Sequence, residues 1–272
     1  MALPIALQLY SVRHEMKADL PATLRKVKEL GYDGVEFAGL FDREPAEIKA
    51  LCEEIGLVPI SAHVPLAEML ADADATFQRY AAIGVRFVAI PSLPEEYRPA
   101  HEKFDEVLEK IKELGAIAKK HGIRLLYHNH DFEFVKMDGT YGLDKIYEEV
   151  SADLLETQLD TCWVNVGGEN PADFVRKYAG RAPVVHLTDF FGEKAENMYE
   201  LIGEKTVAPP KRPKGFEFRP VGHGKQDFPT ILAAAKNAGT EWVVVEQDSP
   251  SMGLDELGCA AKSIAYLKSI NR

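Results

Sequence analysis

A repeating pattern of hydrophobic and polar positions runs along the whole chain. A charged amphipathic segment is followed by a glycine, then by a short β-branched run, and then by a polar or ionisable residue. Five copies align by eye: VKELGYDGVEFAG, CEEIGLVPISAH, YAAIGVRFVAIPS, AKKHGIRLLYHNH and AKNAGTEWVVVEQD. Their glycines (Gly31, Gly56, Gly84, Gly122 and Gly239) are typical of helix C-caps. Each copy therefore predicts a helix that ends near the glycine and a strand that follows it.

The complete pattern predicts eight strands that alternate with eight helices. The runs PIALQLYS, LLETQLDT and APVVHLTD supply the three further strands. The expected helices lie roughly at residues 17–30, 44–55, 65–83, 99–121, 142–150, 170–178, 226–238 and 253–270. Such alternation indicates a parallel sheet with right-handed crossovers, and near-continuous apolar strands indicate that both sheet faces are covered.

Eight such units favour one closed barrel. A chain of 272 residues suits a single-domain (β/α)8 TIM barrel over residues 1–272. The alternative is a doubly wound open sheet, but no GxGxxG turn follows the first strand. We therefore predict the α/β class and the barrel architecture.

One connection is unusually long. After the predicted seventh strand the chain reads FFGEKAENMYELIGEKTVAPPKRPKGFEFRPVGHGKQD, which is rich in Pro, Lys and Gly. In a barrel this segment emerges on the C-terminal face, where barrel enzymes carry their active sites. It is interpreted either as a lid or substrate-binding excursion or as a mobile insertion.

Polar residues follow nearly every predicted strand. They are Gln8, Glu36, His63, Ser92, His128 with His130, Asp160, His186 with Asp189, and Glu246 with Asp248. A lone histidine at a strand end is commonly a hydrogen-bonded residue, and a lone aspartate is commonly a helix N-cap. Asp131, Asp189 and Asp248 fit caps or salt-bridge partners. The convergence of the others on one barrel face is what indicates a site.

Strands five to eight would direct four potential metal ligands toward one axis: His128, Asp160, His186 and Glu246. Asp160 and Glu246 follow buried apolar runs, where an ionised carboxylate is costly unless a cation or a donor meets it. Two carboxylates about 4 Å apart repel by roughly 4 kcal/mol at an effective dielectric of 20. Histidine and carboxylate ligands suit Mn²⁺, Co²⁺, Zn²⁺, Fe²⁺ or Mg²⁺. Cys162 lies near this set and is interpreted as a packing residue.

Composition narrows the classes of partner. A net charge of −11 disfavours nucleic acid, whose binding depends on Lys and Arg. No apolar run approaches the roughly 18 residues that a membrane span needs, and the N-terminus is interpreted as a first strand, not a signal peptide. Three widely spaced cysteines suit a reducing cytoplasm. We expect a cytoplasmic protein with a small-molecule partner, and a homo-oligomer stays open.

Motifs spread along the chain resemble the xylose isomerase-like barrel superfamily, often called sugar phosphate isomerase/epimerases. They are LQLYSVR, YHNHDFEF, LDTCW, HLTD, RPVGHGKQDF and VVVEQD, and they occur in the order of that superfamily. The resemblance implies a metal held by Glu, Asp, His and Glu from strands five to eight. Asp160, His186 and Glu246 match the last three positions. At the first, this chain has His128 followed by Asn129, so His128, His130 or Glu133 would complete the metal shell.

The resemblance also implies a function: a divalent-metal-dependent isomerase or epimerase of a sugar or polyol, acting by proton transfer next to a carbonyl through an enediolate. Glu246, His128 and Glu133 are the candidate acid/base groups. Candidate substrate contacts are His63, Arg219, Glu36, Gln8 and His130. The structural alternatives are a loop salt bridge for Arg219, a barrel-rim charge for Glu36 and a backbone tie for Gln8.

Other functions stay open beside this one. An inosose dehydratase-like enzyme or a keto-glycoside lyase would use the same metal site, and histidine at the strand-five position suits such members. A non-catalytic sugar-binding barrel is the alternative outside enzymes. An abasic-site endonuclease is disfavoured, because Trp163 follows LDTC where a histidine is expected nearby and the chain is acidic.

Overall fold

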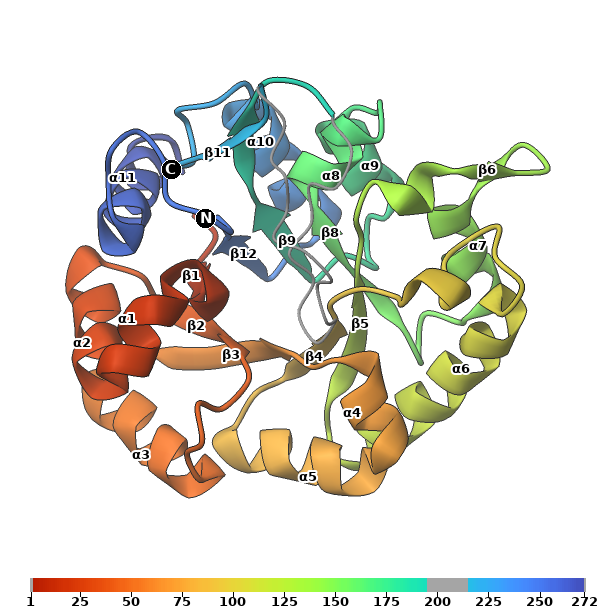
Figure 1. Ribbon diagram of the computed structural model, residues 1–272, viewed down its shortest axis with the longest axis horizontal. Helices are drawn as coiled ribbons and strands as arrows, with labels where there is room; N and C mark the ends of the chain where they lie inside the picture. The colour runs from red at the N-terminus through yellow and green to blue at the C-terminus, as the bar shows by residue number, and fades with distance from the viewer. Residues whose placement is uncertain (1, 195–214, 272) are drawn as a thin grey trace.

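Eight parallel strands close into a barrel, as the sequence predicts. The computed structural model describes residues 2–194 and 215–271. The barrel strands are β1 (Ile5–Gln8), β2 (Gly34–Ala38), β3 (Val58–His63), β4 (Phe87–Ile90), β5 (Arg124–His128), β8 (Glu156–Asp160), β9 (Val184–Leu187) and β12 (Trp242–Val245). Their order around the barrel is β1-β12-β9-β8-β5-β4-β3-β2 (Figure 1). Because every neighbouring pair is parallel, all eight C-terminal strand ends meet on one face.

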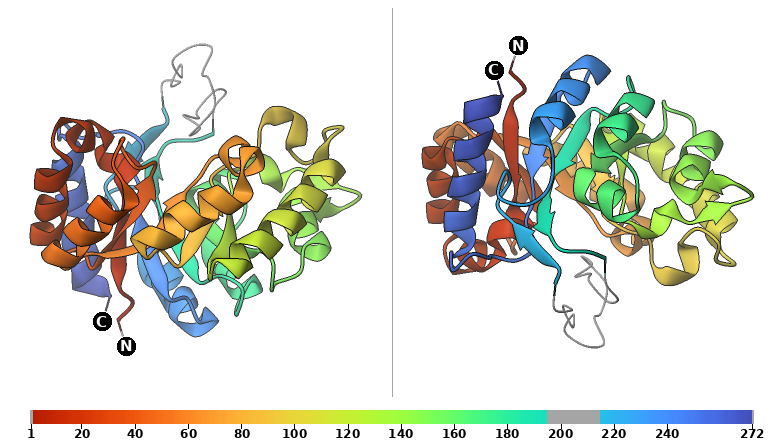
Figure 2. Two further views of the ribbon diagram at one scale, coloured as in Figure 1. Left: turned by 90° about the horizontal axis from the view of Figure 1, so that it is seen from below. Right: turned by 90° about the horizontal axis from the view of Figure 1, so that it is seen from above.

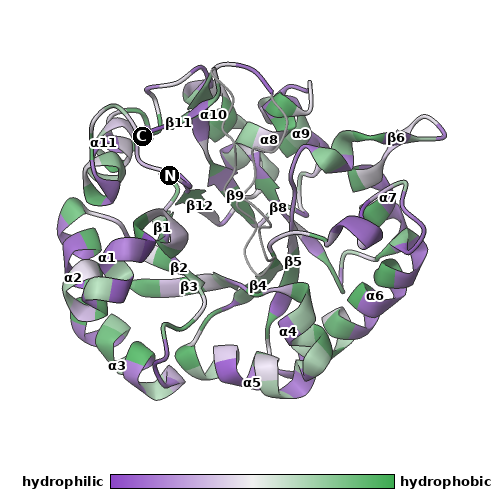
Figure 3. Cartoon of the chain, in the orientation of Figure 1, coloured by the Kyte–Doolittle hydropathy of each residue, from purple (hydrophilic) through white to green (hydrophobic). Residues whose placement is uncertain are grey.

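Helices surround the barrel (Figure 1). They are α1 (Arg13–Ala18), α2 (Leu20–Leu30), α3 (Pro45–Ile55), α4 (Leu66–Ala71), α5 (Ala73–Ile83), α6 (Phe104–Lys120), α7 (Gly142–Glu149), α8 (Thr161–Val166), α9 (Pro171–Lys177), α10 (Phe228–Ala238) and α11 (Glu256–Ile270). Short 3-10 turns are η1 (Leu9–Val12), η2 (Glu95–Tyr97) and η3 (Phe132–Phe134). Purple and green alternate along the helices (Figure 3), as expected when one face packs on the barrel.

Three predicted helix boundaries are wrong. The helix expected at 17–30 is divided at Asp19, whose side chain accepts from the Ala22 amide at 2.9 Å and caps α2. The helix expected at 65–83 is divided in the same way at Asp72, which caps α5. An extended N-cap residue cannot continue the preceding helix, so each aspartate starts a new one. The helix expected from 99 begins at Phe104, after the η2 turn.

The barrel interior has an apolar layer below a polar one. The apolar layer consists of Ala6, Ile60, Phe87, Ala89, Leu126, Val184 and Val244. Below it, Arg124 makes a two-pronged contact with Glu156 and also contacts Glu241. Since side chains alternate along a strand, the inward residues two positions further on form the next layer. That layer includes His128, His186 and Glu246.

A β-bulge in β3 changes which residues face inward. Val35 pairs with Pro59 but Glu36 pairs with Ser61, so Ile60 is the extra residue. Ile60 belongs to the apolar layer, while Ser61 donates to Glu36 and His63 reaches Gln158 across the barrel. The bulge therefore lets one strand contribute to both layers.

The long connection after β9 begins and ends in a two-stranded antiparallel hairpin. β10 (Asp189–Phe191) pairs with β11 (Glu217–Arg219). Asp189 accepts the backbone N–H groups of Phe190, Gly222, Gly224 and Gln226, so it fastens the two ends of the connection together. Residues 195–214, the centre of the predicted lid or insertion, lie outside the described residues. A second small hairpin, β6 (Lys136–Met137) with β7 (Thr140–Tyr141), follows β5.

The two ends of the chain lie side by side (Figure 2). The Asn271 side chain accepts from the Leu3 amide at 3.2 Å and donates to the Leu3 carbonyl at 2.7 Å. These contacts join the end of α11 to the segment that leads into β1, and β1 pairs with β12 where the barrel closes. Among the helices of the described ranges, none combines the length and the apolar character that crossing a membrane requires.

We expect Gly115→Ala to destabilise the fold by about 1–3 kcal/mol, measured by urea unfolding, because overpacking carries that cost. The added Cβ would lie 2.3 Å from the Leu154 carbonyl oxygen, just before β8. Alanine in a helix interior normally stabilises a protein by about 1 kcal/mol relative to glycine. A destabilised Gly115→Ala variant would therefore have the opposite sign from that expected of an uncrowded helix position. Glu113→Ala, at an exposed position of the same helix, is the matched control. A stabilised Gly115→Ala variant would contradict the close approach of α6.

Candidate metal centre

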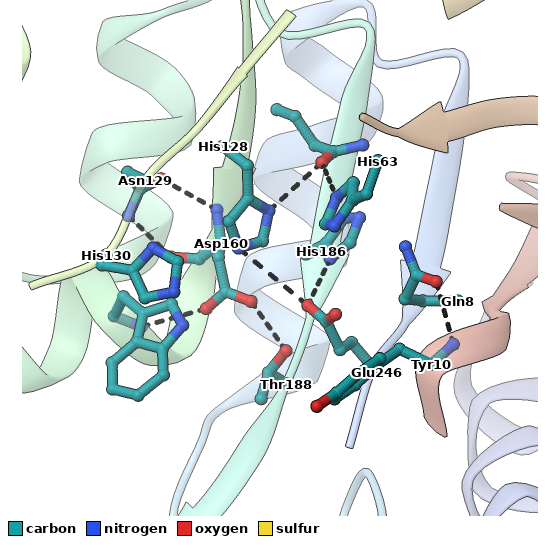
Figure 4. Close-up of polar contacts among 12 residues, drawn as sticks. Gln8, Tyr10, His63, His128, Asn129, His130, Asp160, His186, Thr188 and Glu246 are labelled. Carbon is teal, nitrogen blue, oxygen red and sulfur yellow. Dashed lines mark hydrogen bonds and ion pairs between the residues drawn. The ribbon is translucent and has the colours of Figure 1, made fainter. Parts of the chain in front are cut away.

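Four buried side chains meet at the C-terminal mouth of the barrel. One ligand atom from each of His128, Asp160, His186 and Glu246 lies within 4.8 Å of the others. The first three end or nearly end β5, β8 and β9, and Glu246 directly follows β12 (Figure 4). The set is the one predicted from the strand ends. Two imidazoles and two carboxylates fit a divalent transition metal.

The ring nitrogens of both histidines face Glu246. His186 Nδ1 lies 2.9 Å from Glu246 Oε2, and His128 Nε2 lies 4.0 Å from the same oxygen. Asp160 is held by two donors: the Thr188 hydroxyl at 2.7 Å and the Trp163 amide at 3.0 Å. The Trp163 contact makes Asp160 the N-cap of α8 as well as a candidate ligand. Its carboxylate is therefore fixed before any ion binds.

Asn129 positions the same aspartate through its backbone. The Asn129 amide oxygen accepts from Asp160 N at 2.9 Å, and its NH₂ group faces the Asp160 carbonyl at 3.4 Å. The backbone pairing of β5 with β8 ends at His128 and Gln158, so the Asn129 side chain extends that pairing by one step. The asparagine in HNH thus connects the two strands that carry His128 and Asp160.

The electrostatics of the four groups favour a cation. Burial, and then the neighbouring Glu246, raise the pKa of Asp160 to about 7. Burial lowers the pKa of His186, but Glu36 and Glu246 outweigh it and raise that pKa well above its usual value. Burial, and then the His186 and His63 rings, hold the pKa of His128 well below its usual value. A divalent ion would replace the protons that Asp160 and His186 otherwise retain.

A buried polar layer lies beneath the cluster, and the sequence analysis missed part of it. Glu36 accepts from Gln8 Nε2 at 2.6 Å and from the Ser61 hydroxyl and Gln158 Nε2. His63 Nε2 lies 2.6 Å from Gln158 Oε1. Ser61 and Gln158 each precede a candidate residue by two positions, so strand alternation was the signal that could have identified them.

Glu36 and Gln8 are therefore not rim residues. Glu36 is fully buried, so the barrel-rim alternative is wrong. Burial raises its pKa, but His63 and His186 outweigh that effect and lower the pKa to about 2. Gln8 makes the expected backbone tie, since its Oε1 accepts from the Tyr10 amide at 3.0 Å (Figure 4). It also contacts Glu36, so one side chain has both roles.

His130 and Glu133 do not join the four-residue cluster. The His130 ring stacks between Phe132 and Trp163, and burial, with Arg98 nearby, lowers its pKa to about 3. Glu133 accepts from the Tyr127 hydroxyl and from the His130 amide at 2.7 Å. Burial raises the pKa of Glu133 to about 8, although these two bonds lower it. Tyr127 and His128 are successive strand residues that face opposite sides, so Glu133 lies on the helix side of β5.

Arg219 and Cys162 also lie outside the cluster. Arg219 pairs with Glu217 at 2.7 Å and lies over the exposed Phe191 ring, which is the loop salt bridge kept as its structural alternative. Its role as a substrate contact stays a prediction. Cys162 packs with Trp163 and neighbouring phenylalanines, in agreement with its interpretation as a packing residue.

Asp131 and Asp189 act as structural residues, and the role of the Asp248 side chain stays a prediction. Asp131 is buried and forms an ion pair with Lys194 at 2.5 Å, and Asp189 fastens the β10–β11 connection as described above. The Asp248 carbonyl accepts from Arg13 at 2.8 Å. These three positions are therefore separate from the candidate metal ligands.

A parallel eight-stranded barrel with a His, Asp, His and Glu cluster at its C-terminal mouth defines a TIM barrel with a candidate metal centre. The chain belongs to the family of xylose isomerase-like TIM barrels, whose family model matches residues 24–270. The resemblance noted in the sequence is thereby confirmed, as is the predicted fold.

Three known proteins illustrate these likenesses. An inosose dehydratase of Clostridium tetani is 27% identical over 168 residues, which are 61% of this chain and 54% of that relative, so the match spans about half the relative's length. A sugar phosphate isomerase/epimerase from Parabacteroides distasonis has a TM-score of 0.76 at 23% identity, covering 99% of this chain and 94% of that one. A xylose isomerase-like TIM barrel protein from Mycobacterium smegmatis, in complex with magnesium, has a TM-score of 0.68 at 17% identity over 98% and 96%. The two structures show the fold.

We expect the affinity of the protein for Mn²⁺ to rise between pH 5.5 and pH 8, measured by calorimetry in buffers of different ionisation enthalpy. Asp160, with a pKa of about 7, and His186, with a raised pKa, must both release protons before they can bind an ion. Binding should therefore release protons, most at the acidic end.

The raised pKa of Asp160 also affects how the stability of the metal-free protein changes with pH. The folded chain keeps a proton on Asp160 between its unfolded value of 3.8 and about 7, and the unfolded chain does not. The contribution of Asp160 to the metal-free stability therefore falls as the pH rises through that window, whereas the lowered pKa values of His128 and His130 act in the opposite direction. A loss of this contribution in Asp160→Asn, seen as a difference in the pH dependence of urea unfolding from the wild type, checks the sign, and an affinity for Mn²⁺ that is independent of pH would contradict the assigned proton positions.

Proposed function

We propose that the protein is a divalent-metal-dependent enzyme that isomerises or epimerises a sugar or polyol by moving a proton at a carbon next to a carbonyl. The observation that carries the proposal is the cluster of His128, Asp160, His186 and Glu246 at the mouth of the barrel. Family membership supports the same chemistry, since isomerases and epimerases occur among its structural neighbours.

The donor set fits the proposed ion. His128, Asp160, His186 and Glu246 would hold it, and two imidazoles favour Mn²⁺, Co²⁺, Zn²⁺ or Fe²⁺ over Mg²⁺. A bound divalent ion supplies Lewis acidity, which makes a C–H group beside a carbonyl easier to deprotonate. Three buried, unpaired cysteines suit the cytoplasmic setting that we propose. A homo-oligomer stays a possible state of the enzyme.

The residues of the chain supply binding and proton transfer. Glu246 is the proposed acid/base group, because it lies at the mouth beside the cluster. His128 was the other candidate, but its Nδ1 faces Gln158 and its Nε2 would bind the ion, so we propose it as a ligand. His63 has a buried Nδ1 without a protein partner, which suits an acceptor for a substrate hydroxyl. His130 and Arg219 are proposed to border the substrate, and Gln8 and Glu36 to support it from below. Glu133 would act indirectly, by holding the His130 backbone.

Dehydration is the second candidate. It shares the first proton abstraction but ends with loss of a β-hydroxyl, and a keto-glycoside lyase would differ only in its leaving group. Two observations favour it: His128 ends β5, where the family resemblance implies a glutamate ligand, and inosose dehydratases are among the sequence relatives. A sugar-binding barrel without activity remains the alternative outside enzymes.

We expect the metal-loaded protein to exchange one carbon-bound proton of its substrate for deuterium in D₂O. The measurement is proton NMR over a panel of ketoses, inososes and 3-keto-glycosides. Glu246→Gln keeps the shape but removes the carboxylate, so exchange should fall by about 10²- to 10⁴-fold. Glu113→Gln, on the exposed face of α6, is the control and should exchange at the normal rate.

The products distinguish the candidates. A rearranged sugar supports isomerisation or epimerisation, and a product lighter by one water supports dehydration. Absence of exchange across the whole panel, in protein shown to contain its metal, would refute proton abstraction beside a carbonyl.

A further inference from the structure

Glu36 is surrounded by hydrogen-bond donors. Gln8 Nε2 lies 2.6 Å from Oε1, and the Ser61 hydroxyl and Gln158 Nε2 contact Oε2. His186 Nε2 and His63 Nε2 lie 2.8 and 3.2 Å from Oε1. An ionised carboxylate only accepts hydrogen bonds, so each of these partners must turn an N–H or O–H group toward it. One buried carboxylate therefore sets the direction of the contacts that these partners make with it.

The first consequence concerns the amide of Gln158. Because its NH₂ group donates to Glu36, its oxygen must face the opposite way. There Gln158 Oε1 lies 3.1 Å from His128 Nδ1 and 2.6 Å from His63 Nε2. An amide oxygen only accepts, so His128 must carry its hydrogen on Nδ1. Its Nε2 then presents a lone pair on the side of Glu246.

The second consequence concerns His186. Carboxylates face both of its ring nitrogens, Glu36 at Nε2 and Glu246 at Nδ1. With an ion bound beside Glu246, Glu36 keeps the hydrogen on Nε2, and Nδ1 is the nitrogen whose lone pair can bind the ion. Nδ1 is the atom 2.9 Å from Glu246 (Figure 4). In the ion-bound protein the two histidines therefore adopt opposite tautomers, and each directs its free nitrogen into the same space. The orientation of the Gln8 amide is fixed independently, because the Tyr10 amide donates to its oxygen and leaves its NH₂ group to donate to Glu36.

We propose that Glu36 is a positioning residue for the metal centre: it selects the His186 tautomer directly and the His128 tautomer through Gln158. Glu36 was expected to contact substrate, but it is fully buried, and the partners given above are side chains of the barrel interior. Outer carboxylates that accept from the second nitrogen of a ligating histidine fix the ring and increase its basicity. Here one carboxylate serves two ligands. The inference rests on the metal centre of the proposed function.

This arrangement also chooses between two possible sites. Among the described residues, His63, His128 and His186 form a second group whose ligand atoms lie within 4.8 Å of one another. On the side of Glu36 and Gln158, the nitrogens of these rings carry hydrogens and cannot bind an ion. We infer that the ion binds on the side of Asp160 and Glu246.

The test measures tautomers directly in the full-length protein. With ¹⁵N-labelled histidine and Zn²⁺ added alone, long-range ¹H–¹⁵N spectra distinguish the protonated nitrogen of each ring from the one that binds the ion. We expect protonated Nε2 in His186 and protonated Nδ1 in His128. Glu36→Gln can donate as well as accept, so it should lose this order and weaken Zn²⁺ binding by about 10- to 100-fold. Ser61→Ala removes one donor but keeps the carboxylate, so it should retain both tautomers.

The outcomes separate this inference from the proposed function. Zn²⁺ bound through His186 Nε2, or wild-type tautomers and affinity in Glu36→Gln, would overturn the role of Glu36 but leave a metal enzyme intact. A wild-type protein that binds no divalent ion would overturn both. If Glu36→Gln fails to fold, the wild-type spectrum alone still decides, because it requires no variant.

Discussion

Two carboxylates buried side by side are the constraint on which this site depends. Asp160 and Glu246 offer oxygens within 4.8 Å of each other at the mouth of the barrel, with almost no solvent contact. At an effective dielectric of 20, two charges at that distance repel by roughly 3.5 kcal/mol, before desolvation is counted. Protons reduce this repulsion in the metal-free chain, which is why the pKa of Asp160 is raised. A divalent ion removes it while leaving both groups ionised.

The barrel makes this arrangement possible through strand alternation. The same strands that bury Leu126, Val184 and Val244 in the apolar layer present His128, His186 and Glu246 two residues later. The apolar layer excludes water from below, so contacts in the polar layer form in a low dielectric and are strengthened by it. Asn129 and Thr188 then hold Asp160 from the sides. The same strands therefore supply the apolar core at one level of the barrel and the candidate site at the next level.

Much of the fold could be predicted from sequence, because the period of the pattern is a local property. The eight strands, the C-cap glycines and the four candidate ligands at strand ends all follow from alternation and helix termination. The divided helices were missed because Asp19 and Asp72 occur within runs of helical periodicity, where only their caps reveal the break. Gln158 and Ser61 were missed because an uncharged residue within an apolar strand carries no signal until the barrel places it beneath a site.

The position of Glu133 could not be derived from spacing at all. It stands five residues after His128, but the chain turns at the end of β5 and leads it behind the strand to Tyr127. Glu36 was also misplaced by local pattern. Its charge suggested a position on the barrel rim, but the bulge in β3 brings Ser61 beside it in the barrel interior. Both outcomes depend on tertiary geometry that no local pattern encodes.

We propose that one divalent ion binds between the two imidazoles and the two carboxylates at the mouth of the barrel. The most direct measurement is anomalous X-ray diffraction at the manganese edge from crystals grown with Mn²⁺. We predict one strong peak bounded by His128 Nε2, Asp160, His186 Nδ1 and Glu246. A peak on the His63 side of the rings, or no peak at this mouth, would contradict the account.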